Sequence, residues 1–296
     1  MIDGILNVYK EKGYTSHDVV AKLRGILKMK KIGHTGTLDP DAEGVLPVCL
    51  GKGTKLCDLL TEKEKSYEAV LLLGRETDTQ DITGRTLEER PAEATEEELR
   101  QIISGFIGTV EQIPPMYSAI KVNGQKLYQL ARAGREIDRP ARQIQIYNIV
   151  IEEISLPRVR MRVDCSKGTY IRTLCHDIGR KAGCGGCMEA LIRLRSGMFS
   201  IENSLKLREI EELSCQGSLE KYILPVDQFF SGCPSVRLNS RDDARAHNGN
   251  PLPWQKAKEN RFRVYDSEGR FIGVYEKDEK KQMLTPWKMF YSEHGR

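Results

Sequence analysis

The clearest hydrophobic pattern in the chain begins just after Thr95. Apolar side chains recur there at intervals of three and four residues, at Leu99, Ile102, Ile103, Phe106 and Ile107. This spacing places them on one face of a helix. Thr95 followed by Glu98 is a capping box, in which the two residues satisfy free backbone N–H groups at a helix start. We therefore predict an amphipathic helix that begins after Thr95.

Apolar spacing and capping residues predict two further helices. One runs from Ser16, its candidate N-cap, to about Met29, and the other begins at Tyr170 with Thr169 as its candidate cap. Short apolar or alternating stretches predict strands at residues 4–9, 44–50, 66–74, 144–155 and 158–164. The polar residues 75–85 predict a loop. Helices and strands thus mix along the chain, which indicates an α+β fold.

The pattern changes after about residue 230, where short strands and turns replace the helical spacing. Residues 262–275 predict a β-hairpin with its tip at Ser267–Gly269. We place a domain boundary near residues 229–234. It divides the chain into a larger domain over residues 1–230 and a small β-rich domain over residues 235–296.

Composition adds limits on the class of protein. The chain has 296 residues, of which 39% are apolar and 30% charged, as in soluble globular proteins. It has no apolar run long enough to span a membrane and no secretory signal at its N-terminus, so we expect a cytoplasmic protein with no membrane attachment. Its eight cysteines are too few for a disulfide scaffold. The Cys184–Cys187 spacing lacks a second ligand pair, so we expect no metal site.

Net charge is only +4, but the charges are segregated along the chain. Basic residues dominate 121–142 and 158–181, whereas acidic residues dominate 76–98. In the predicted strand at 158–164, arginines alternate with apolar residues, which predicts one core face and one basic face. Such stretches are typical of a polyanion-binding surface. They are also typical of solvated faces, and the charges alone leave both interpretations open.

One glycine- and proline-rich stretch, residues 31–48, carries an unusual set of polar groups. It holds His34, Asp39 and Asp41, and Pro40 favours an extended backbone at the residue before it. Its aspartates could bond to their own backbone in a tight turn. One of them could instead be a catalytic acid on a stiff loop. The stretch alone does not distinguish the two aspartates.

Several motifs together resemble the TruB-type family of pseudouridine synthases. They are GHTGTLDP (33–40), KSY (65–67), TDTQD (77–81), PPMYSAIK (114–121), GTYIR (168–172) and LIRLRSG (191–197). They follow one another in the family's order across residues 1–230. The chain departs from the family at Glu11, where proline is usual after Lys10. The C-terminal segment resembles, more weakly, the PUA-like RNA-binding module of such enzymes.

The resemblance implies a role for individual residues. Asp39 matches the essential aspartate, Tyr67 the tyrosine that stacks on the target base, and Arg172 the arginine that pairs with the catalytic carboxylate. Tyr170 and Leu191 match residues of the uracil pocket. A further match, His34, corresponds to the histidine that holds the flipped-out nucleotides. Expected RNA contacts are Lys10, Lys121, Arg132, Arg135 and Arg193, with an RNA-gripping insertion at about 115–143.

The family's fold is a mixed, mainly antiparallel sheet flanked by helices. Its activity, as implied here, is isomerisation of uridine 55 in the T-loop of tRNA. The base is flipped out, its N-glycosidic bond is cleaved, and the uracil is reattached through C5. Nothing is added or lost, so no cofactor or metal is expected. The expected partner is the T-arm stem-loop of tRNA, bound by a monomer without an obligatory protein partner.

Three other functions fit only part of the sequence. A related synthase guided by a small RNA would share the motifs, but the full insertion and compact C-terminal segment favour stand-alone action. An RNA-binding or RNA-folding module would not need Asp39, Tyr67 and Arg172, although such a role could coexist with the enzyme. A nucleotide-dependent modifier, such as a methyltransferase, would need a cofactor-binding glycine loop after a strand, and none is convincing.

Overall fold

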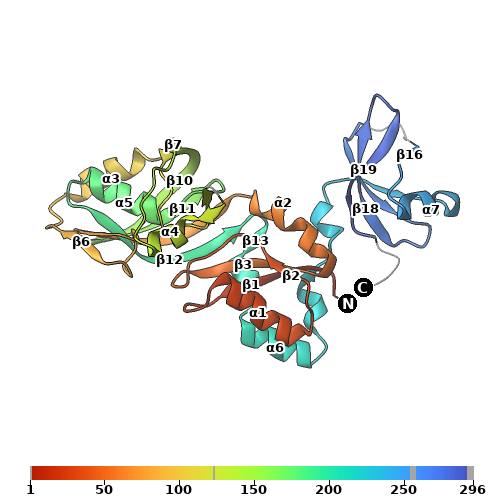
Figure 1. Cartoon of the computed structure of the whole chain (residues 1–296), viewed down its shortest axis with the longest axis horizontal. Helices are drawn as coiled ribbons and strands as arrows, with labels where there is room; N and C mark the ends of the chain where they lie inside the picture. Colours follow the sequence, from red (N-terminus) through yellow and green to blue (C-terminus); the bar gives the residue numbers. More distant parts are fainter. Residues whose placement is uncertain (1, 123, 254–257, 292–296) are drawn as a thin grey trace.

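The chain folds into a large mixed sheet with helices and a smaller β-rich C-terminal domain, seen in a computed structural model (Figure 1). The structure describes residues 2–122, 124–253 and 258–291. Position 123 of the predicted insertion and residues 254–257 and 292–296 of the predicted C-terminal domain lie outside this description. The arrangement confirms the α+β class.

The large sheet has ten strands, in the order β14-β1-β3-β12-β4-β11-β10-β7, with β13 beside β12 and β2 beside β3. Its neighbours pair antiparallel except β12 and β3, which are parallel. The strands are β1 (Gly4–Lys10), β2 (Ile32–His34), β3 (Glu43–Leu50), β4 (Lys65–Leu73), β7 (Gly108–Gln112), β10 (Arg142–Ser155), β11 (Arg158–Cys165), β12 (Gly186–Ser196), β13 (Phe199–Ser200) and β14 (Ile223–Leu224). The predicted mixed, mainly antiparallel sheet is therefore confirmed.

β12 is the strand that joins the two halves of this sheet, and the sequence pattern had not predicted it. It lies between β3 and β4. At its contact with β3, a side chain on Gly44 would come within 2.3 Å of the Arg193 carbonyl oxygen, and the Gly44 φ is 103°. Glycine is therefore required there on both steric and conformational grounds.

Seven α-helices and four short 3₁₀-helices complete the described parts of the chain. They are α1 (Ser16–Leu27), α2 (Cys57–Thr61), α3 (Glu96–Ser104), α4 (Leu127–Arg132), α5 (Ile171–Lys181), α6 (Leu207–Cys215) and α7 (Ser240–His247), with η1 (Gly51–Leu56), η2 (Ile201–Asn203), η3 (Leu219–Tyr222) and η4 (Gln228–Phe230). Within this part of the chain, no helix is both long and apolar enough to cross a membrane.

The capping box of α3 is confirmed, but two other predicted caps are wrong. Thr15, not Ser16, caps α1, through a capping box with Asp18. α5 begins one residue later than predicted, at Ile171, and the Thr169 hydroxyl donates instead to the Ser166 carbonyl. Because Thr15 caps α1, the Ser16 hydroxyl is free for a tertiary contact.

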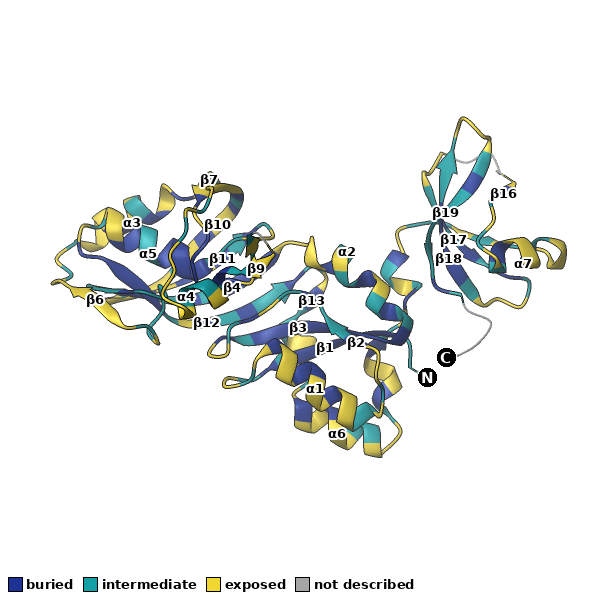
Figure 2. Ribbon diagram, viewed as in Figure 1, coloured by how far each residue is buried: buried dark blue, intermediate teal, exposed yellow. Residues whose placement is uncertain are grey.

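Helices cover the large sheet in two separate groups, and the buried positions lie beneath them (Figure 2). α3 and α5 pack on the half that contains β4, β11 and β10. α1 and α6 pack on the half that contains β1 and β3. The two halves therefore have separate cores, and the loop that follows β2 lies where they meet.

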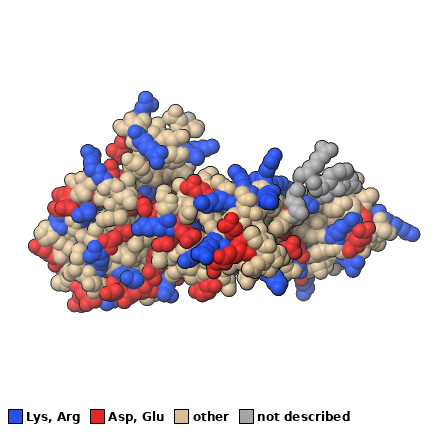
Figure 3. All heavy atoms as spheres, turned by 90° about the horizontal axis from the view of Figure 1, so that it is seen from below, with Lys and Arg blue, Asp and Glu red and all other residues tan. Residues whose placement is uncertain are grey.

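β11 alternates as predicted, with its apolar side chains buried and its arginines on the exposed face, but that face is not a free basic surface because the arginines are paired with acids. Side-chain nitrogens of these arginines lie 2.7–3.4 Å from carboxylate oxygens, in the pairs Arg158–Glu189, Arg160–Glu68 and Arg162–Glu152. On the face drawn in Figure 3, acidic and basic side chains are likewise interspersed. The acids lie on three other strands of the sheet, β4, β10 and β12, so a single strand's pattern could not reveal the pairing.

The C-terminal domain is a five-stranded sheet in the order β15-β17-β18-β19-β16. Its strands are β15 (Ser235–Arg237), β16 (Leu252–Pro253), β17 (Arg261–Tyr265), β18 (Phe271–Asp278) and β19 (Met283–Met289). The predicted hairpin is confirmed as β17 and β18. Two small hairpins lie elsewhere: β5 (Arg75–Thr77) with β6 (Thr86–Glu89), and β8 (Lys121–Val122) with β9 (Gln125–Lys126). The predicted loop at 75–85 therefore begins with a strand.

Candidate active site

The loop between β2 and β3 is anchored on both sides of Asp39. On one side, the Leu38 backbone N–H donates to the buried Ser16 hydroxyl at 2.9 Å. On the other side, the Lys10 ammonium donates to the carbonyls of Pro40 at 3.1 Å and Ala42 at 2.6 Å. The Asp39 backbone is therefore held between fixed neighbours, which leaves its carboxylate free to face the site.

Two of the predicted RNA contacts are wrong, because they lie inside the protein. Lys10 has no exposed surface, and burial lowers its pKa to about 8. Arg193 is 1% exposed and donates to the carbonyls of Val45 at 2.6 Å and Gly36 at 3.3 Å. Both cations use their donors to hold the loop that carries Asp39, so neither is available to a phosphate.

Replacing Ser16 with alanine is expected to loosen this loop. The buried Leu38 N–H would lose its acceptor, which costs about 1–3 kcal/mol of folding stability, and kcat should fall because Asp39 is less well positioned. Thr15→Ala is the matched control, since removal of the α1 cap costs about 1 kcal/mol without touching the loop. Chemical denaturation and single-turnover kinetics measure both effects. An equal loss of kcat in the two variants would contradict the positioning role.

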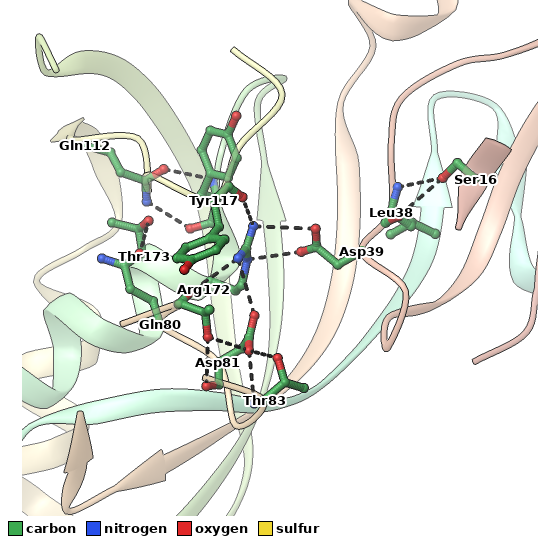
Figure 4. Close-up of polar contacts among 12 residues, drawn as sticks. Ser16, Leu38, Asp39, Gln80, Asp81, Thr83, Gln112, Tyr117, Arg172 and Thr173 are labelled. Carbon is green, nitrogen blue, oxygen red and sulfur yellow. Dashed lines mark hydrogen bonds and ion pairs between the residues drawn. The ribbon is translucent and has the colours of Figure 1, made fainter. Parts of the chain in front are cut away.

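Arg172, the second residue of α5, reaches across the junction of the two halves to Asp39 (Figure 4). Its Nε lies 3.0 Å from Asp39 Oδ2, and its Nη2 lies 3.5 Å from Oδ1. The Arg172 side chain is 6% exposed, whereas that of Asp39 is 41% exposed. The pair thus has a buried cation and a carboxylate open on one side, with its oxygens oriented by the guanidinium.

Three further groups hold the same guanidinium. Its Nη1 lies 3.3 Å from Asp81 Oδ2 and donates to the Thr79 carbonyl at 3.2 Å, while Nη2 donates to the Tyr117 carbonyl at 2.9 Å. Asp81 is itself fixed, because its Oδ1 accepts bonds from the backbone and hydroxyl of Thr83. Sequence reasoning did not select Asp81. The only signal for it was its place at the end of the TDTQD motif.

These charges oppose one another in their effect on Asp39. Burial raises the pKa of Asp39 above its ordinary value, Arg172 lowers it, and the second carboxylate, Asp81, raises it again. One guanidinium is therefore shared by two carboxylates. The ionised form of Asp39 is favoured less than it would be in an isolated ion pair.

Replacing Asp81 with asparagine is expected to lower the pKa of Asp39, because one neighbouring negative charge disappears. If the reaction requires ionised Asp39, the acid limb of the pH–rate profile should move to lower pH. Asp78→Asn, in the same motif, is the control. The measurement is single-turnover rate against pH. A limb that stays in place, or moves to higher pH, would show that the Asp81 charge does not act on Asp39.

An apolar wall lies beside the ion pair. Tyr67 on β4 and Leu191 on β12, each 8% exposed, belong to one buried cluster with Leu38 and Ile171. Arg193 lies opposite Tyr67 in the register of β12 and β4, and burial raises the pKa of the Tyr67 hydroxyl. The structure thus brings Asp39, Tyr67, Leu191 and Arg172 together from four separate segments.

Tyr170, the residue before α5, is fixed by a side chain that the sequence analysis missed. Its backbone N–H donates to Gln112 Oε1 at 2.8 Å, and Gln112 Nε2 donates back to its carbonyl at 3.0 Å. This two-bond clamp fixes the backbone of the residue at the start of α5, which has no side-chain cap. Arg172 lies two residues after Tyr170. Gln112 therefore also fixes the position of the Arg172 backbone, from which the guanidinium reaches Asp39.

The remaining predicted residues lie around the site. His34 ends β2, its ring meets that of His17 edge-on at 5.1 Å, and burial lowers its pKa to about 4, so it is neutral near pH 7. Lys121, Arg132 and Arg135 are exposed on the insertion. The insertion begins beside the site, because its Tyr117 carbonyl accepts the bond from Arg172.

The arrangement can place an oriented carboxylate against a planar group held on the apolar wall. Such a carboxylate can act as a nucleophile or as a base. Among the residues that the structure describes, no three histidines, cysteines, aspartates or glutamates are grouped so as to hold a metal ion.

Three family profiles match successive parts of the chain. The profile of the TruB family pseudouridylate synthase N-terminal domain matches residues 24–171. That of the tRNA pseudouridylate synthase B C-terminal domain matches residues 172–231, and that of the pseudouridine synthase II TruB C-terminus matches residues 234–283. Together the three profiles match most of both domains.

Curated relatives and solved structures agree with these profiles. The chain is 54% identical to tRNA pseudouridine synthase B of Lachnoclostridium phytofermentans, over 98% of this chain and 100% of the relative. It is 42% identical to tRNA pseudouridine synthase B of Bacillus pumilus, over 96% of each chain. A chain in a crystal structure of a Cbf5-Nop10-Gar1 complex is 26% identical, with a TM-score of 0.71 over 97% of this chain and 85% of that one.

Proposed function

The chain belongs to the TruB family of pseudouridine synthases, and on that basis we propose that it isomerises uridine 55 in the T-loop of tRNA. It is an isomerase that forms pseudouridine in tRNA. The observation that carries the more specific proposal is the Asp39–Arg172 ion pair beside the apolar wall of Tyr67 and Leu191. An oriented carboxylate next to a base-sized apolar surface is what the reaction needs.

The reaction breaks the N-glycosidic bond of uridine and joins the same uracil to the ribose through C5. No atom is gained or lost overall, because the proton that leaves C5 is balanced by one that N1 acquires. The target base must leave its stack to reach the carboxylate. Tyr67 then replaces the lost stacking partner, with Leu191 and Tyr170 around the uracil. We propose no cofactor or metal for these steps.

Asp39 is the catalytic group in this proposal. Its carboxylate either adds to the sugar or base, or removes a proton from the ribose while a glycal forms. Arg172 keeps the carboxylate ionised and orients its oxygens. Burial raises the pKa of Asp39 and the Arg172 guanidinium lowers it, which supports this division of roles, because burial without the guanidinium would favour the protonated form still more.

Other groups bind and position the RNA. His34, neutral and at the end of β2, holds the flipped-out nucleotides by hydrogen bonding rather than by charge. The exposed residues Lys121, Arg132 and Arg135 grip the T-arm from the insertion at about 115–143. Residues 1–230 form the catalytic domain and residues 235–296 an RNA-binding domain in this proposal. We propose a monomer that acts in the cytoplasm, where its eight free cysteines stay reduced.

A T-arm stem-loop labelled with tritium at uridine C5 tests the function directly. The purified chain should release tritium to water without added cofactor, metal or protein. Binding of the stem-loop without release would refute catalysis at this site. If tritium is released only from RNA whose labelled uridine lies at a position other than 55, the assignment of position 55 is refuted.

One alternative rests on a specific observation. Related folds occur in an H/ACA RNP bound to a substrate RNA, with 24% identity and a TM-score of 0.70. A guide-dependent enzyme would leave the stem-loop unmodified until a second RNA is added. Modification of the stem-loop by the purified chain alone would therefore exclude this alternative.

A further inference from the structure

Four lysines gather where the large sheet meets the C-terminal domain. Lys31 directly precedes β2, Lys52 and Lys55 lie in η1, and Lys288 lies on β19. Residues three apart in a 3₁₀-helix project from the same side, so Lys52 and Lys55 extend together. We call these four residues the junction lysines. They are not part of the site described above.

Backbone contacts bring these segments together. The Gly51 N–H, at the start of η1, donates to the Lys31 carbonyl at 2.9 Å. The Lys55 ammonium donates to the Met289 carbonyl at 2.7 Å and lies 6.0 Å from the Phe290 ring centre. The junction lysines therefore come from three segments that are fixed against one another.

Their charges are largely uncompensated. Burial lowers the pKa of Lys55, and Lys31, Lys52 and Lys288 lower it further by repulsion. Within the described ranges, the one ion pair formed by any junction lysine joins Lys52 to Asp3 at 4.0 Å. Repulsion raises the electrostatic energy of a group of like charges on a surface, and a bound anion among them lowers it.

Strand β2 links the junction lysines to His34 of the proposed active site. β2 begins directly after Lys31 and ends at His34, and three residues of extended chain span about 10 Å. Lys288 extends the same surface onto the C-terminal domain, which lies on the far side of η1 and α2 from the α5 half of the sheet (Figure 1). An RNA held at Asp39 could therefore continue over the lysines towards the second domain.

We propose that the junction lysines bind backbone phosphates of the tRNA outside the T-arm stem-loop. This inference rests on the proposed function, since it assumes that tRNA occupies the site. Lysine binds phosphate as a flexible point charge, without demanding one geometry. Contacts from both domains would set the angle at which a whole tRNA enters, while the stem-loop alone would reach only the catalytic domain.

The test compares two substrates with the double variant Lys31→Ala/Lys52→Ala, which leaves the Lys55–Met289 contact in place. The value of kcat/KM for full-length tRNA, divided by that for the T-arm stem-loop, should fall about tenfold. The slope of log affinity for full-length tRNA against log salt should decrease by about 2. Lys288→Ala, which removes a junction lysine of the C-terminal domain, should lower the same ratio.

Lys181→Ala/Lys221→Ala is the charge-matched control, because it removes two exposed lysines from α5 and η3. A ratio that stays constant in the junction variant, or falls equally in the control, would overturn the proposal. An equal loss on both substrates would do the same, since it would place the lysines against the stem-loop or in the fold. Wild-type protein inactive on both substrates would instead refute the proposed function.

Discussion

Asp39→Asn is expected to lower the single-turnover rate of tritium release by at least ~10⁴-fold, because it removes the proposed nucleophile or base. The amide is nearly isosteric with the carboxylate and does not ionise. Affinity for the T-arm stem-loop should change by less than about threefold, since the surrounding donors and the apolar wall stay in place. A binding titration and a single-turnover assay on the same preparation measure the two quantities.

Folding stability gives this prediction a second readout. Because the pKa of Asp39 is raised in the folded state, its ionised form costs folding free energy at every pH above that pKa. The variant should therefore unfold at the same temperature as the wild type, or at a higher one, near pH 7. A catalytic group commonly shows this trade of stability for activity.

The control for Asp39 is the other aspartate of the same loop. Asp41→Asn alters an exposed side chain two residues away and should leave the rate within about threefold of the wild type, as surface changes away from a site usually do. Tritium release by Asp39→Asn at the normal rate would contradict the assignment of the catalyst. Loss of activity in both variants would show that the loop, rather than one carboxylate, had been disturbed.

Arg172→Lys is expected to be the second most damaging change, although it conserves charge. One ammonium cannot contact Asp39 through two nitrogens and also reach Asp81 and the Tyr117 carbonyl. The rate should fall by about 10²–10³-fold because the carboxylate loses its orientation. Weaker pairing should also raise the pKa of Asp39, so the acid limb of the pH–rate profile should move to higher pH.

The acid limb for Arg172→Lys should thus move in the opposite direction to the acid limb for Asp81→Asn. The two shifts together test whether Asp39 and Asp81 share the Arg172 guanidinium. Arg180→Lys is the matched control, since it makes the same exchange at an exposed position of α5 and should change neither rate nor profile. An Arg172→Lys rate within about threefold of the wild type would mean that a single positive charge suffices. Limbs that move in the same direction would contradict the charge balance around Asp39.

Features that depend on neighbouring residues could be predicted well from the sequence. The helix after Thr95 and the hairpin at 262–275 follow from side-chain periodicity and turn residues, which act over one or two turns of chain. The motifs indicated Asp39 rather than Asp41, and they also named Tyr67 and Arg172. The strand β12 escaped prediction because its glycine-rich start and mixed polarity match neither helical nor strand spacing.

The partner of each charged side chain was decided only by the tertiary structure. The sequence gives no sign that Lys10 and Arg193 are buried beneath the Asp39 loop, or that the β11 arginines meet acids on other strands. Nor does it indicate that Asp81 shares Arg172, which reaches Asp39 across 133 positions of the chain. The sequence by itself indicated the central groups of the site, Asp39, Tyr67 and Arg172. The fold decided which of them meet, because an ion pair depends on distance in space and local periodicity carries no information about it.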